Sequence, residues 1–197
     1  YKLIAKRVGG TDGVAHYQFE IGSDWTVPGT VITPAGAKGT TLLVADSGRK
    51  TQAARIKQLL ATNQRVVAID PFFFGESKIN SRDFLHVLLM HAVGERALGI
   101  QSSQIAAVAG WAKKGVGGAV QLSSVGPRLS VPARIAMVQT DAISGLDLYE
   151  PMESLKSVIK KNRGANHLPE MMCYGLLEYF DLPVMDKMIA PRKVAKK

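Results

Sequence analysis

The sequence predicts an α/β protein in which a mostly parallel sheet carries helices on both faces and follows a leader of antiparallel strands. Two observations predict this fold class. Along residues 40–197, short continuous apolar stretches typical of fully buried strands alternate with stretches of helical periodicity, which favours a parallel sheet. Residues 1–39 instead hold extended stretches separated by glycine and proline. We therefore expect one domain over residues 1–197, with the leader in residues 1–39 and an α/β core in residues 40–197.

The leader is predicted to form extended segments over residues 1–8, 14–21 and 24–34, followed by a turn over residues 35–39. The first of them reads as an edge strand that ends at Gly9-Gly10. The second alternates as a half-buried strand does, with Tyr17, Phe19 and Ile21 on one face.

The core is predicted to contain buried strands over residues 40–46, 65–70, 119–125 and 142–149. Helices are expected over residues 51–63, 83–114, 130–137 and 152–161, the second of them broken near Gly94 or Gly99. The inner stripe of the first helix consists of Ala54, Ile56, Leu59 and Leu60. The inner stripe of the last consists of Met152, Leu155, Val158 and Ile159.

Composition excludes some classes of protein. With 46% hydrophobic residues the chain can bury a substantial core. Its most apolar stretches, such as residues 85–90, are far shorter than the roughly 20 residues that span a bilayer, so we expect no membrane partner. The single Cys173 excludes an internal disulfide and a cysteine-rich zinc site, and its apolar neighbours predict a buried thiol.

The formal net charge of +9 can mark a surface for nucleic acid or another polyanion. The basic residues are dispersed, however, apart from dense groups in residues 156–163 and 187–197, and no aromatic residues interleave with them. We expect solvated helix faces and a basic terminus, not a nucleic-acid site.

Several residues could carry chemistry, and most have a simpler interpretation. The glycine clusters at residues 36–39 and 115–118 lead into strands, so neither is a phosphate loop. His86 and His91 are five positions apart and do not share a helix face as a metal pair would. Asp46 and Asp70 follow buried strands, where they can cap the next loop or face a ligand.

Residues 119–130 read as a strand, a tight turn and the start of a helix. In an α/β-hydrolase such a turn carries the nucleophile as G-x-S-x-G. If Gly126 is the first glycine, the nucleophile position holds Arg128; if it is the last, the position holds Ser124, with Leu122 in place of the first glycine. We prefer the Arg128 alignment, because Gly126 then opens the turn. An arginine is permanently protonated and cannot attack an ester.

Further segments carry a family resemblance. Residues 69–77, Ile-Asp-Pro-Phe-Phe-Phe-Gly-Glu-Ser, resemble the loop after the fourth strand of α/β-hydrolases. Residues 93–101 are similar to the G-R-x-L-x-G-x helix of acetyl-xylan-esterase-like hydrolases, and residues 168–183 and 188–194 fit the stretch leading into the seventh strand. The resemblance covers residues 29–194.

The resemblance implies an α/β-hydrolase-like fold in a degenerate or truncated member. It places the nucleophile at Arg128 or Ser124 and the oxyanion donors in the loop that contains Gly48 and Arg49. The family's acid and histidine follow the seventh and eighth strands. Because the given sequence ends at Lys197, just after the Pro191-Arg192 turn, we expect the last strand or strands and both residues to be missing. An exposed sheet edge would then favour a homodimer. His167 is the only histidine after the turn and hence the one candidate base.

The leading hypothesis is therefore a degenerate domain resembling acetyl xylan and other carbohydrate esterases, without a complete Ser-His-Asp triad. One alternative is an active carboxylesterase that uses Ser124, with His167 or another chain supplying the base. Another is a non-enzymatic binding module, in view of the positive charge. The resemblance suggests a carbohydrate ester as ligand and a secreted or extracytoplasmic protein. We expect no metal and no cofactor.

Overall fold

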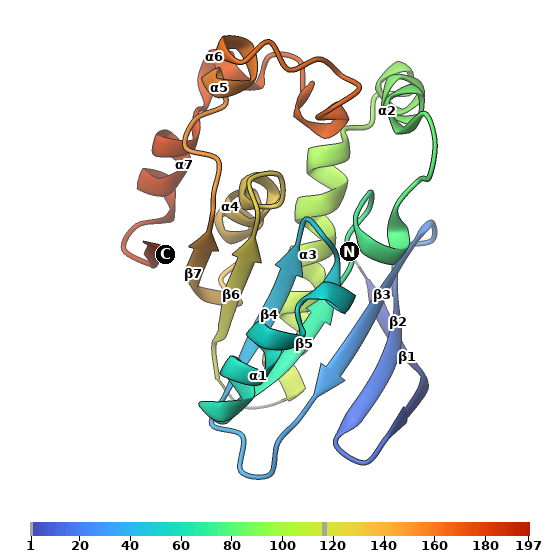
Figure 1. Ribbon diagram of the computed structural model, residues 1–197, viewed down its shortest axis with the longest axis vertical. Helices are drawn as coiled ribbons and strands as arrows, with labels where there is room; N and C mark the ends of the chain where they lie inside the picture. Colours follow the sequence, from blue (N-terminus) through green and yellow to red (C-terminus); the bar gives the residue numbers. More distant parts are fainter. Residues whose placement is uncertain (1, 116–117) are drawn as a thin grey trace.

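A computed structural model describes residues 2–115 and 118–197, in which the strands form one eight-stranded sheet of order β1-β2-β3-β5-β4-β6-β7-β8 (Figure 1). The strands are β1 (Leu3–Thr11), β2 (Val14–Ile21), β3 (Trp25–Ile32), β4 (Gly39–Ala45), β5 (Gln64–Ile69), β6 (Val120–Val125), β7 (Ile143–Tyr149) and β8 (Lys193–Lys196). Two predictions extend outside the described residues: the leader strand begins at Tyr1, and the glycine cluster at residues 115–118 includes Val116 and Gly117.

The helices are α1 (Ala53–Ala61), α2 (Asp83–Ala92), α3 (Ala97–Gly115), α4 (Ser130–Gln139), α5 (Lys156–Lys160), α6 (Leu176–Tyr179) and α7 (Leu182–Ile189). Short 3₁₀ turns are η1 (Arg49–Thr51), η2 (Gly75–Ser77) and η3 (Pro169–Met171). Among the described residues, no helix is long and apolar enough to cross a membrane.

The sheet has an antiparallel and a parallel half. Strands β1, β2 and β3 pair antiparallel, and β3 joins β5 antiparallel. From β5 through β4, β6 and β7 to β8, every pair is parallel. The prediction of a mostly parallel sheet behind an antiparallel leader is confirmed. Since parallel strands point the same way, the loops that follow β4, β5, β6 and β7 meet at one edge of the sheet.

Helices cover both faces of the sheet, as predicted. On one face Ile105 of α3 and Ala133 of α4 belong to the main core, together with Leu122 of β6. On the other face Leu59 of α1 packs against a smaller cluster that includes Leu43 of β4. Figure 1 shows α1 in front of the sheet and α3 behind it. The predicted break in the long helix falls at Gly94, between α2 and α3.

Several local predictions were wrong. The expected helix over residues 152–161 is only α5, which begins at Lys156. The backbone N–H groups of Met152 and Leu155 donate to the side chains of Ser130 and Asp181, so the residues before α5 are tied to α4 and to the residue before α7. Met152 and Leu155 are buried as expected, but Ile159 is 71% exposed.

Three smaller differences concern the exposure of Ala54, the end of β1 and the burial of Cys173. Ala54 is exposed, since α1 packs through Ile56, Leu59 and Leu60. Strand β1 has a register shift between Arg7 and Gly9 and continues past both glycines to Thr11. The Cys173 thiol is only partly buried, and this burial raises its pKa.

The α5 region offers a matched test of the packing. We predict that Leu155→Ala lowers the free energy of unfolding by about 2–5 kcal/mol, because a buried leucine leaves a cavity. Ile159→Ala should change it by less than about 0.5 kcal/mol, since that side chain is exposed. Urea unfolding of both variants checks this; equal losses would contradict the burial of only one face.

Candidate functional site

The turn between β6 and α4 lies at the edge where the parallel strands end, and its tightest point is Gly126. Gly126 has a φ of 102°, a region that favours glycine. Neither Ser124 nor Arg128 has a positive φ. In α/β-hydrolases the nucleophile occupies the strained position of this turn. Gly126 is therefore a third candidate for that position beside Arg128 and Ser124, and one that sequence reasoning missed. The Gly-Pro pair was the signal that could have found it.

Asp46, at the end of β4, closes the space above Gly126. A Cβ atom built on Gly126 would lie 2.5 Å from Cγ of Asp46 and 2.6 Å from its Oδ2. Real Cβ atoms are almost never found so close to other atoms. With Asp46 in this position, the turn has no room for any side chain at residue 126.

The Asp46 carboxylate also caps the start of α4. Its Oδ2 accepts the backbone N–H of Arg128 at 2.9 Å, and its Oδ1 accepts that of Leu129 at 2.8 Å. These groups would otherwise lack partners at the start of the helix. Burial raises the pKa of Asp46, although both N–H groups oppose the shift. Asp46 was predicted to cap the loop that directly follows it; it caps the distant turn before α4 instead.

The Arg128 side chain is held by a buried glutamate. Its Nε and Nη2 each donate to Glu170 at 2.6 Å, and Glu170 has no exposed side-chain surface. The guanidinium lies 4.8 Å from the ring centroid of Phe74. Burial lowers the pKa of Arg128, but its hydrogen bonds and charge interaction with Glu170 outweigh burial and raise it. Such a bidentate pair fixes both side chains.

The loop after β4, where the oxyanion donors were predicted, is also held by hydrogen bonds and ion pairs to carboxylates. The backbone N–H of Arg49 donates to Oδ1 of Asp70 at 2.7 Å. Oδ2 of Asp70 accepts the backbone N–H of Glu76 at 3.1 Å, which confirms that Asp70 caps the loop that follows it. The Arg49 guanidinium pairs with Asp70 and with Glu76, the latter at 2.6 Å. A Cβ on Gly48 would lie 2.6 Å from Cα of Gly75. The Arg49 N–H is thus already used within the fold.

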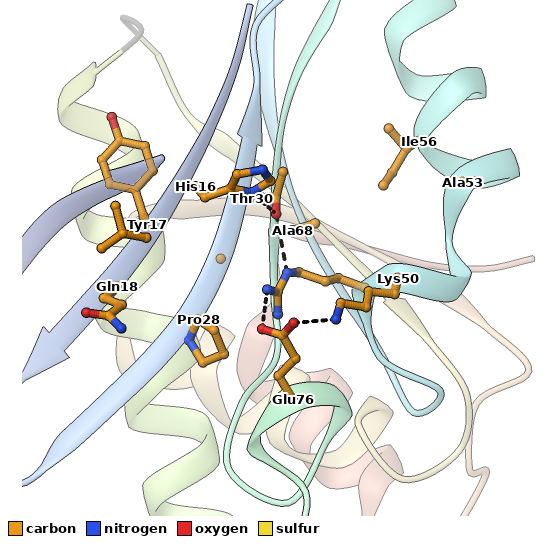
Figure 2. A pocket seen from close by; sticks show the side chains of 13 residues that line it. His16, Tyr17, Gln18, Pro28, Thr30, Lys50, Ala53, Ile56, Ala68 and Glu76 are labelled. Carbon is orange, nitrogen blue, oxygen red and sulfur yellow. Dashed lines mark hydrogen bonds and ion pairs between the residues drawn. The ribbon is translucent and has the colours of Figure 1, made fainter. Parts of the chain in front are cut away.

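A pocket of about 490 Å³ opens beside this loop, on the α1 side of β2 and β3 (Figure 2). In it Nδ1 of His16 lies 3.1 Å from Oγ1 of Thr30, and Nε of Arg49 donates to the same oxygen at 3.3 Å. Figure 2 shows Lys50 and Glu76 directed toward one another, at 2.6 Å. Every nitrogen of the Arg49 guanidinium therefore has a partner in the protein.

The two predicted catalytic residues lie in different environments. Ser124 is inside β6 with 0% exposure, and its Oγ has no hydrogen-bond partner in the described part of the chain. His167 is exposed and lines a pocket of about 460 Å³ together with Arg128. The structure thus brings His167 to the candidate Arg128 but leaves Ser124 inaccessible to solvent. In residues 2–115 and 118–197, no three His, Cys, Asp or Glu side chains are placed to hold a metal ion.

The fold as a whole superposes on solved structures. A putative acetyl xylan esterase from Bacteroides fragilis superposes with a TM-score of 0.76 at 13% identity, over 100% of this chain and 62% of that chain. The fold is α/β-hydrolase-like. An acetyl xylan esterase from Paenibacillus sp. R4 gives 0.58 at 10% identity, over 85% of this chain and 59% of that one. A cold-adapted esterase from an Arctic intertidal metagenomic library gives 0.56 at 15% identity, over 98% and 87%.

At these identities the likeness shows the fold alone. The chain spans 62% and 59% of the two acetyl xylan esterase chains, less than two thirds of either. No protein-family model matches the sequence, and no curated protein sequence matches it.

The contact between Gly126 and Asp46 predicts a coupled pair. Gly126→Ala should destabilise the protein by about 1–3 kcal/mol from backbone strain alone, and by more because the new Cβ meets Asp46. In an Asp46→Gly background the same change should cost less, and a double-mutant cycle by urea unfolding measures the difference. Gly118→Ala is the control, since Gly118 has a φ of +128° but no atom within 4 Å of a new Cβ. Additive losses would contradict the contact.

The Arg49–Glu76–Lys50 network predicts a pH dependence. Hydrogen bonds from Lys50 and Arg49 hold the pKa of Glu76 below its ordinary 4.5. The stability contributed by its carboxylate is therefore complete above the ordinary pKa and is lost as the pH falls through the lower folded-state value. Urea midpoints measured from about pH 3 to 6 should fall less steeply toward acid in Glu76→Gln than in the parent. Parallel pH profiles would show that Glu76 contributes nothing to the acid limb.

Proposed function

We propose that this is a non-hydrolytic domain of α/β-hydrolase-like fold, whose strand-end site binds a ligand and forms no acyl-enzyme. It would be a degenerate relative of acetyl xylan and other carbohydrate esterases. The observation that carries the proposal is the Asp46 carboxylate, whose two oxygens accept the Arg128 and Leu129 N–H groups.

The absence of a nucleophile at the turn supports the proposal. The strained position holds Gly126, which has no side chain, and Asp46 leaves no room for one. Arg128, the candidate preferred from the sequence, is an ion-paired cation and cannot attack an ester. Ser124 lies in the strand with no exposed surface.

The oxyanion donors support it as well. In α/β-hydrolases one donor is the backbone N–H of the residue after the nucleophile. For Arg128 this residue is Leu129, whose N–H is taken by Asp46. For Gly126 it is Pro127, which has no N–H. For Ser124 it is Val125, which lies in β6, the strand between β4 and β7.

The charge at this point also opposes acyl transfer. A carboxylate that occupies the N–H groups at the start of α4 takes donors that could stabilise a developing oxyanion, and it repels the negative charge. One observation favours a second candidate function, a carboxylesterase that uses Ser124. Among the described residues its Oγ has no hydrogen-bond partner, so an opening of the strand end would expose an unpaired hydroxyl.

Hydrolysis of a short-chain aryl acetate separates the two candidates. We expect no turnover above the uncatalysed rate for the parent and for Ser124→Ala, in this chain and in the longest natural protein that contains it. Ser123→Ala is the matched control, since Ser123 is also fully buried in β6 with an unpartnered Oγ. Turnover that Ser124→Ala abolishes and Ser123→Ala retains would overturn the proposal and identify an esterase.

A further inference from the structure

A pocket at the ends of β6 and β7 combines a cavity with uncompensated positive charge. Its volume is about 460 Å³. Pro127 and Arg128 of the β6–α4 turn form one wall, and Pro151 and Met152, which follow β7, form another. In open parallel sheets this edge is where ligands bind.

A loop after α5 completes the pocket with basic residues. Lys161, Arg163 and His167 all line it and are all exposed. The backbone fixes the loop: Arg163 N–H donates to the Val158 carbonyl oxygen at 2.9 Å, and His167 N–H donates to that of Gly164 at 3.0 Å. The loop therefore has a defined shape while its side chains remain available to a ligand.

Two acidic residues near the pocket, Glu170 and Glu153, are already paired with other cations. The Glu170 carboxylate accepts hydrogen bonds from Nε and Nη2 of Arg128. Glu153, which lines the pocket, pairs with Lys196 of β8. Within residues 2–115 and 118–197, no ion pair joins Lys161 or Arg163 to a carboxylate. Internal pairing thus neutralises the acids and leaves the two loop cations without a partner of opposite charge.

We propose that this pocket binds a small molecule through a carboxylate or phosphate group held by Lys161 and Arg163. His167 lines the same wall and can add a hydrogen bond. Arg128 cannot be the main anion ligand, because Glu170 already takes its Nε and Nη2 donors. Guanidinium and ammonium groups are the usual protein partners of both anions. The anion site rests on the proposed function in one respect, namely that the ligand at this edge is held and not hydrolysed.

Titration calorimetry with separate probes tests the site. Inorganic phosphate and glucuronate present the two anions, and glucose is the neutral counterpart of glucuronate. We expect saturable binding of at least one anion, none of glucose, and weaker binding as salt is added. The anion that binds more tightly identifies the natural group.

Lys161→Gln/Arg163→Gln should weaken that binding about tenfold, the loss expected for two exposed charge contacts. Lys57→Gln/Lys114→Gln removes the same charge from exposed lysines outside the pocket and should change affinity less than about twofold. Equal weakening in both variants would show a diffuse charge effect, and no saturation at about 10 mM of either anion would show no site; each outcome overturns the proposal. The aryl acetate assay is independent of this result, so a failure of one is distinguishable from a failure of the other.

Discussion

The Asp46 carboxylate is the interaction on which the strand-end site depends. It links the end of β4 to the start of α4 by accepting two backbone N–H groups, from residues 82 and 83 positions away in the chain. The same carboxylate lies where a side chain on Gly126 would have to go. A single acid therefore stabilises the turn, excludes a nucleophile from it and occupies donors that could serve an oxyanion. The stability of the turn and the lack of space beside Gly126 therefore have one physical cause.

The segment above the strand ends is tied to the same turn. Arg128 joins the turn to Glu170 of η3. Behind them the Asp181 side chain accepts hydrogen bonds from Leu155 and Ser154, and Arg134 of α4 pairs with Asp186 of α7. Leu182 and Met185 pack in a separate apolar cluster beneath these contacts. These contacts hold the turn and the segments that surround it in place. The exposed cations beside the turn, Lys161 and Arg163, lie in the loop after α5.

Much of the fold could be predicted because its signals are local. Strands β4 and β5 each contain a continuous apolar run, over residues 42–45 and 66–69, and the Gly-Pro pair separates β6 from α4. The helix predicted over residues 152–161 failed for the opposite reason. Its apolar spacing fits a helix, but residues 152–155 make hydrogen bonds to the distant side chains of Ser130 and Asp181, and the helix begins only at Lys156. Ile159, expected on the inner face, is exposed.

The sequence by itself determined the α/β class, the antiparallel leader, the positions of the buried strands along the chain and the place of the turn after β6. Each of these follows from periodicity or from glycine and proline within a few residues. Only the tertiary structure decided which side chains close the turn and which donors are free. Those outcomes depend on partners such as Asp46 and Arg128, or Arg128 and Glu170, which lie 82 and 42 positions apart. Contacts over such separations leave no periodic trace in the sequence, because they are fixed by how the strands assemble into one sheet.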